Sequence, residues 1–188
     1  MENKQTLLQF TMTNGLVLGI VLVIFSVLLY MLNIMPDTLG KIMLIPLFNA
    51  VVVIIFVVKG TKSYRNKILG GTISYRNAFL VGLLIIVFAY ILKSFYDLIF
   101  NLLIDPGYME RLYEGLFNWA YNFYSNIGFS ESQIDEVIKR FERQQDNYTP
   151  IRAFFSSVFA SASMGAVLSL ITAAILKKDP LPFGQDEQ

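Results

Sequence analysis

The sequence contains neither cysteine nor histidine among its 188 residues, and it is poor in charged side chains. Without these residues, disulfides, thiolate nucleophiles, haem ligation and the common zinc sites are excluded. Only 15% of the residues are charged and 55% are hydrophobic, against roughly a quarter charged in an ordinary soluble domain. The net charge of +1 provides no clustered basic face for nucleic acid. We therefore expect a membrane protein that binds no nucleic acid, metal or other cofactor.

Four stretches with few or no charges are long enough to cross ~30 Å of hydrocarbon, which takes ~20 helical residues. We predict membrane-spanning α-helices over residues 12–35, 42–58, 77–100 and 153–176. Pro46 would then fall near the first turn of the second span, where proline is tolerated. The predicted fold class is an all-α integral membrane bundle of four transmembrane helices, forming a single domain over residues 1–188.

The basic residues beside the spans predict the orientation, because lysine and arginine resist export. The connection 59–76 holds five basic residues and no acid, which indicates a cytoplasmic location. Lys177 and Lys178 follow the last span and Lys4 precedes the first. Both termini are therefore predicted to be cytoplasmic, including the C-terminal tail 177–188.

The connection between the third and fourth spans would then lie outside the cytoplasm, and it is acidic, with eight carboxylates against five basic residues. We expect an extracytoplasmic amphipathic helical hairpin over residues 105–147. Asp105, followed by proline, is typical of a helix N-cap, and Gly128 is typical of a helix end. Ser130 and Gln133 have the spacing of a capping box that begins the second helix.

The first helix of this hairpin has an aromatic face, and two interpretations of that face stay open. It rests on the membrane surface or on the mouth of the bundle, as amphipathic helices beside spans commonly do. Alternatively, Trp119, Tyr121 and Tyr124 dock a partner protein, because aromatic side chains are favoured interface anchors.

Lys93 and Asp97 are two charges within the third span, and their i, i+4 spacing puts them on one helix face. Charges inside a span usually face inward and serve a function, so this pair could belong to an ion or proton path. The structural alternative is a mutually neutralising pair whose lysine extends toward the interface. A path would need polar groups on other helices, and Asn49 is the main candidate.

Small residues recur every four positions in the last span and form a strip that lets helix backbones approach closely in lipid. The strip consists of Ser157, Ser161, Gly165, Ser169 and Ala173. We expect it to pack within the monomer, with contact to another copy or another subunit as the alternative.

Several motifs resemble a known family in their order and spacing. They are GGTISYRNAF at residues 70–79, IDPGY at 104–108, Gly165, SLI at 169–171 and AAILKK at 173–178. Together they resemble an uncharacterised bacterial family, classed as a domain of unknown function, of small four-span inner-membrane proteins. The resemblance implies the same topology in a bacterial inner membrane and supplies no catalytic residues.

Two functional hypotheses follow, and both have the lipid bilayer as a partner. The first is a non-catalytic accessory or scaffolding subunit of an envelope complex, bound to another membrane-protein subunit or to itself. The alternative is a small channel or transporter component that uses Lys93 and Asp97. We do not expect an enzyme, because no serine is placed with a histidine base and no acid pair marks a hydrolytic site.

Overall fold

The computed structural model describes residues 6–178, and this range contains six α-helices and one π-helix. They are α1 (Leu7–Met31), α2 (Leu39–Lys67), α3 (Tyr75–Ile99), the π-helix η1 (Phe100–Ile104), α4 (Tyr108–Asn126), α5 (Glu131–Asp146) and α6 (Pro150–Leu176). Four helical segments are long and apolar enough to span a membrane, namely α1, α2, α3 together with η1, and α6. The prediction of an all-α, four-span protein is confirmed. Lys4 and residues 179–188 of the predicted tail lie outside the described residues.

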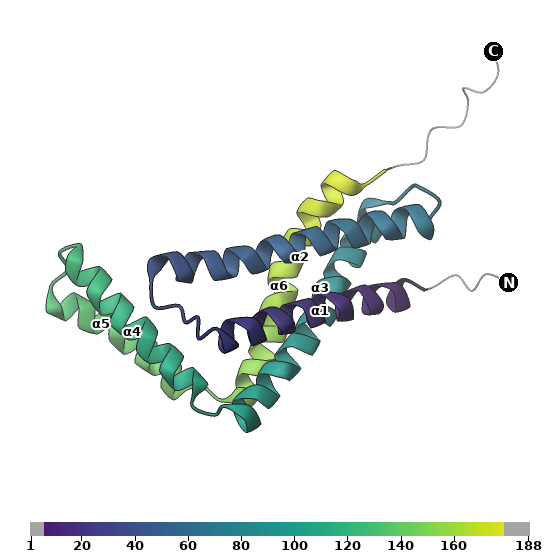
Figure 1. The fold of residues 1–188 in the computed structure, drawn as a ribbon. Coiled ribbons are helices and arrows are strands. Elements are labelled where there is room, and N and C mark those ends of the chain that lie inside the picture. The colour runs from purple at the N-terminus through teal and green to yellow at the C-terminus, as the bar shows by residue number, and fades with distance from the viewer. Residues whose placement is uncertain (1–5, 179–188) are drawn as a thin grey trace, which may run out of the picture.

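Helix α3 is the centre of the bundle, since it packs against α1, α2 and α6. Figure 1 shows the start of α1, the α2–α3 connection and the end of α6 at one end of the molecule. The α1–α2 connection and the α4–α5 pair lie toward the other end. Helices α4 and α5 pack chiefly against each other, and they extend away from the four long helices.

Glycines allow α3 to approach its neighbours closely. A Cβ added to Gly15 or Gly19 of α1 would lie 2.8 Å from a backbone oxygen of α3. On the other side of α3, a Cβ on Gly82 would lie 2.8 Å from the Ser169 hydroxyl of α6. Close backbone contact through small residues is the usual way in which helices associate in lipid, where no hydrophobic effect drives them together.

The apolar side chains divide into a buried set and an outward-facing set. Leu18, Val57, Val81 and Ile85 are almost completely buried between the helices. Many large apolar side chains of the four long helices are exposed instead. An apolar surface this extensive would be unfavourable in water and matches a lipid environment.

Helix α2 differs from its predicted span at both ends. It begins at Leu39 and continues to Lys67, so the basic residues after Val58 belong to the helix and not to a loop. Pro46 therefore lies inside the helix and not in its first turn, which corrects the prediction. The uncharged stretch underestimated the helix because lysine side chains can reach toward the interface while their backbone remains helical.

The predicted start of the first hairpin helix is wrong. Helix α4 begins at Tyr108 with Gly107 at its N-cap, and Asp105 instead follows the end of η1. The Asp105 carboxylate does not cap the helix because it pairs with the Arg111 guanidinium and accepts a hydrogen bond from the Tyr30 hydroxyl at 3.1 Å.

The predicted end of α4 at Gly128 is confirmed. Gly128 has a φ of +86°, which favours glycine, and its N–H donates to the carbonyl of Ser125 at 3.1 Å. The N–H of Phe129 donates to the carbonyl of Tyr124 at 3.1 Å, and the two rings are 5.0 Å apart. This is a Schellman motif with its accompanying apolar contact. At Ser130, the backbone N–H donates to the side chain of Gln133 at 3.0 Å, as the capping-box spacing predicted.

Two backbone hydrogen bonds fasten the end of α6 to the α2–α3 connection. Ile73 and Lys178 exchange N–H to carbonyl bonds, both 3.0 Å long. The end of α6 therefore lies beside the α2–α3 connection, and the Arg65 guanidinium at the end of α2 donates to the Leu176 carbonyl at 3.3 Å.

Candidate functional site

A polar cavity of about 330 Å³ lies where α3 ends and α6 begins, and we call it the α3-end cavity. Its wall comes from α1, α3, η1, the start of α4 and the start of α6, together with Tyr148 of the α5–α6 connection. Among residues 6–178, Lys93 and Asp97 are its only charged lining residues. Asn49 does not line it, and its amide bonds instead to the Ile45 carbonyl of its own helix at 3.4 Å.

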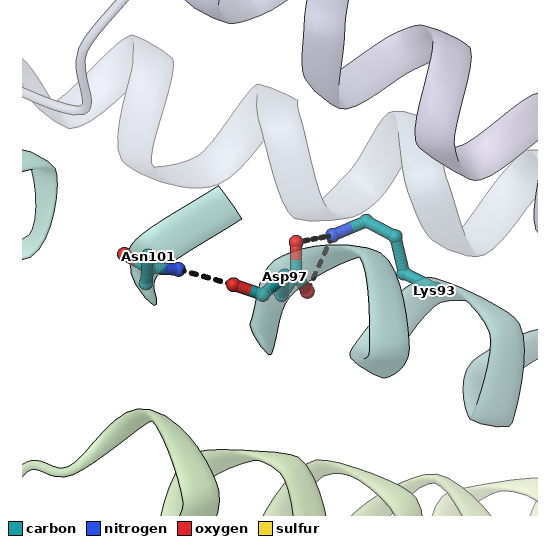
Figure 2. A network of polar contacts seen from close by, with 3 residues as sticks. All are labelled: Lys93, Asp97 and Asn101. Carbon is teal, nitrogen blue, oxygen red and sulfur yellow. Dashed lines mark hydrogen bonds and ion pairs between the residues drawn. The ribbon is translucent and has the colours of Figure 1, made fainter. Parts of the chain in front are cut away.

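The charged pair of the α3-end cavity forms a ladder along α3 with Asn101 (Figure 2). Lys93 Nζ donates to both carboxylate oxygens of Asp97, at 2.6 and 2.7 Å. The amide of Asn101 donates to the backbone carbonyl of Asp97 at 2.7 Å. The lysine side chain is 19% exposed and the aspartate side chain 43%, so the carboxylate is the more accessible partner.

Two oxygens beside this ladder are buried without a hydrogen-bond partner among the described residues. They are Ser94 Oγ and Asn101 Oδ1, and both residues line the α3-end cavity. The amide of Asn101 cannot be reversed, because that would place its oxygen against the Asp97 carbonyl. A buried polar atom without a partner is costly, but both oxygens are almost completely inaccessible, so the Asp97 carboxylate is the acceptor that the cavity exposes to a guest.

An aromatic cluster borders the cavity on the side of α1 and α4. The ring of Phe100 lies 4.9 Å from Tyr30, 5.8 Å from Tyr96 and 5.4 Å from Tyr108. Burial raises the pKa of Tyr108, and the negative charge of Asp97 adds to the effect. The rings therefore make the wall apolar and keep the tyrosine hydroxyl neutral.

The π-helix η1 sets the position of two of these residues. Phe100 and Asn101 open η1 and are buried, and the N–H of Asp105 reaches back to the Phe100 carbonyl at 2.9 Å. Single π turns occur frequently at functional sites because the wider turn reorients side chains. At this position the π turn follows directly after the turn of α3 that carries the charged pair.

A second hollow of about 520 Å³ adjoins the first, and we call it the arginine cavity. Arg143 of α5 and Arg152 of α6 line it, and no carboxylate does. Within residues 6–178 neither guanidinium takes part in an ion pair. The two hollows share Tyr148, Ala153 and Ser157 as lining residues, so they meet at the start of α6.

The small residues predicted on the last span have different surroundings. Ser161, Gly165, Ser169 and Ala173 are buried, and a Cβ on Gly165 would lie 3.0 Å from the Ile86 side chain of α3. Ser157 is exposed and lines both hollows. In the structure the strip therefore contacts α3 of the same chain along most of its length.

The three aromatic residues predicted for docking lie on α4, away from the cavities. Trp119 stacks on Phe123 at 5.3 Å and is half-buried. Tyr124 is half-buried between Phe123 and Phe129, whereas Tyr121 is 49% exposed. Only Tyr121 of the three is fully available on the surface.

The sequence analysis missed Ser94, Asn101 and the two arginines as site residues. Asn101 had a usable signal, since it continues the i, i+4 series that starts with Lys93 and Asp97. The arginines had none, because they come from two different helices on either side of a turn.

Comparison with known proteins identifies the family but no characterised relative. Neither the curated proteins nor the solved structures give a match. The family profile described as "Protein of unknown function (DUF4199)" matches residues 13–178, which is most of the chain. This multi-pass membrane protein with four spanning helices therefore belongs to the DUF4199 family.

Proposed function

We propose that the protein is a non-catalytic accessory subunit of a membrane complex, and that the α4–α5 hairpin docks a partner protein. The proposed setting is a bacterial inner membrane with both termini in the cytoplasm and the hairpin outside. The basic residues Lys59, Lys62, Arg65 and Lys67 at the end of α2 and Arg76 at the start of α3 support this orientation, because positively charged segments stay on the cytoplasmic side.

The observation that carries the proposal is the division of α4 into two apolar faces. One face packs on α5, where Ala120 and Ile134 are buried and the rings of Phe117 and Phe141 are 6.0 Å apart. On the other side of α4 the Trp119 and Phe123 rings stack and are half-buried, whereas Tyr121, two residues from each, points away from them and is 49% exposed. Because the hairpin is already closed by its first face, the exposed Tyr121 and the partly exposed Trp119 and Phe123 rings remain available for another protein, and aromatic anchors of this kind dominate interface energies.

A photo-crosslinking amino acid at position 121 tests this proposal in the native membrane, with the same replacement at the exposed Glu142 of α5 as the matched control. We expect position 121 to capture one protein in stoichiometric amount and position 142 to capture none. Crosslinks from position 121 to lipid alone would overturn the proposal, because the aromatic face would then rest on the membrane.

A second candidate, a channel or transporter component, is favoured by the Lys93–Asp97 pair at the α3-end cavity. A path through the monomer would have to continue past Leu18 and Ile85, which are fully buried in the core. This candidate therefore needs a second copy or another subunit to complete a path. Ion flux into liposomes that is abolished by Lys93→Met with Asp97→Asn, at unchanged assembly, would favour it over the accessory role.

A further inference from the structure

The α3-end cavity exposes the Asp97 carboxylate as a hydrogen-bond acceptor for a guest. The Asp97 carboxylate has about four lone-pair sites and uses two of them for Lys93, and it remains 43% exposed. Lys93 Nζ stands 5.9 Å from the centroid of the Tyr96 ring, which shows that this wall accommodates a cation. The complement of these groups is a compact cationic donor such as a primary ammonium.

The arginine cavity has the opposite character. Arg143 Nε donates to the Lys139 carbonyl at 3.1 Å and one terminal nitrogen of Arg152 donates to the Asn147 carbonyl at 3.3 Å. Each guanidinium has five N–H groups, so most of its donors remain for a ligand. Helix α6 also begins here after its N-cap Thr149, and the start of a helix carries a partial positive charge. The complement of this hollow is a phosphate-like anion.

The two cavities are close enough to bind one molecule together. Tyr148 lines both, and its pKa is raised by burial and then by the negative charge of Asp97. The field of the carboxylate therefore reaches the ring that stands between the hollows. A ligand that occupies both cavities would need a positive and a negative group joined by a short linker.

We propose that the two cavities together bind an alkylammonium phosphate, the zwitterionic phosphoethanolamine headgroup of a membrane lipid. The ammonium donates to the free lone pairs of the Asp97 carboxylate, and the phosphate accepts from Arg143 and Arg152. The proposal goes beyond the accessory role and does not depend on whether the hairpin docks a partner.

A lipid is the source that the surrounding surface favours. Phe155 and Phe159 follow Arg152 along α6 and are 66% and 77% exposed. They continue the apolar surface of the spanning helix from the arginine cavity toward the membrane interior. A headgroup held by the cavities could therefore lay its acyl chains along this surface without leaving the bilayer.

Lipid retention on the full chain in mild detergent tests the proposal by native mass spectrometry with added phosphatidylethanolamine, phosphatidylcholine or phosphatidylglycerol. We expect phosphatidylethanolamine to bind at least about tenfold more tightly than the other two, because a charged hydrogen bond is worth roughly a factor of ten or more. The trimethylated headgroup has no N–H to donate, and the glycerol headgroup has no cation. Equal binding of all three lipids, or preference for phosphatidylglycerol, would overturn the proposal.

Two variants separate the ends of the site. Arg152→Gln weakens the phosphate end, and the double change Lys93→Met with Asp97→Asn removes the ammonium acceptor without leaving an unpaired charge. Each is expected to lower the affinity for phosphatidylethanolamine by about tenfold. The matched control is Lys41→Met with Asp37→Asn, which removes an i, i+4 ion pair of the same 2.7 Å length that lines neither cavity. An equal loss of affinity in the control would refute the site.

Soluble phosphoethanolamine distinguishes a lipid from a free metabolite as the source of the headgroup. We expect it to displace the lipid at high concentration while binding much more weakly, because it has no acyl chains. Binding as tight as that of the lipid would overturn the lipid assignment in favour of the soluble molecule. Failure to displace the lipid at any concentration would overturn the headgroup site itself.

Discussion

Gly15→Ala should weaken the contact between α1 and α3 on which the bundle depends. The new Cβ would lie 2.6 Å from the Cβ of Phe88 and 2.8 Å from the carbonyl oxygen of Ile85. Neither atom is the flexible end of a side chain, so the two helices must move apart. Overpacking of this kind costs about 1–3 kcal/mol, and replacing glycine with alanine in a helix returns about 1 kcal/mol. We expect a net loss of up to about 2 kcal/mol in the free energy of unfolding.

Equilibrium unfolding by sodium dodecyl sulfate, followed by circular dichroism, measures this change. Gly40→Ala is the matched control, because Gly40 lies in a spanning helix and its Cβ would meet nothing within 4 Å. The control should leave the unfolding free energy unchanged or raise it by up to about 1 kcal/mol. If Gly15→Ala were as stable as the control, the close approach of α1 to α3 would be refuted.

Two further predictions concern the region around α4. Gly128→Ala places a Cβ on a residue with a φ of +86°, so it should cost about 1–2 kcal/mol of local stability and speed amide hydrogen exchange at the end of α4. The control Gly115→Ala, whose new Cβ would meet no atom within 4 Å, should not change the exchange. The hydrogen bond from Arg111 lowers the pKa of Asp105 below its usual value of 3.8. The stability that this pair contributes is therefore fully present above that value and is lost as the pH falls through the lowered pKa. A carboxyl-carbon NMR titration of Asp105 that gave a midpoint above 3.8 would contradict this direction.

The spanning helices were predictable because long uncharged stretches need a hydrocarbon environment, but their ends were not. Helix α2 continues to Lys67, since nothing in a lysine prevents a helix from extending beyond the apolar core. At Asp105 the local pattern indicated an N-cap, yet Arg111 and Tyr30 take up the carboxylate instead. A contact between distant residues overrode a short-range signal in that case.

The two cavities could not be predicted from the periodicity of the sequence, because each is lined by residues of several helices. The Lys93–Asp97 pair and the strip of small residues on the last span could be predicted from the sequence, because each lies on one face of one helix. Gly15 and Gly19 of α1, which pack against α3, could also have been found from the sequence, because they have the same four-residue spacing. The adjacency of the α3-end cavity and the arginine cavity depends on how the α4–α5 hairpin returns the chain to the bundle, and no local pattern carries that information.

The central position of α3 has a consequence for the order in which the chain is made. Helices α1 and α2 leave the ribosome before the helix on which both of them pack, and α1 contacts α3 more extensively than it contacts α2. The first two spans must therefore remain unpacked in the lipid, or beside the insertion machinery, until the third span has been inserted. The last span, α6, can pack on α3 only after the whole α4–α5 hairpin has been translated. If the ribosome stalls within the hairpin, the side of α3 that faces α6, which includes Gly82 and Ile86, stays uncovered.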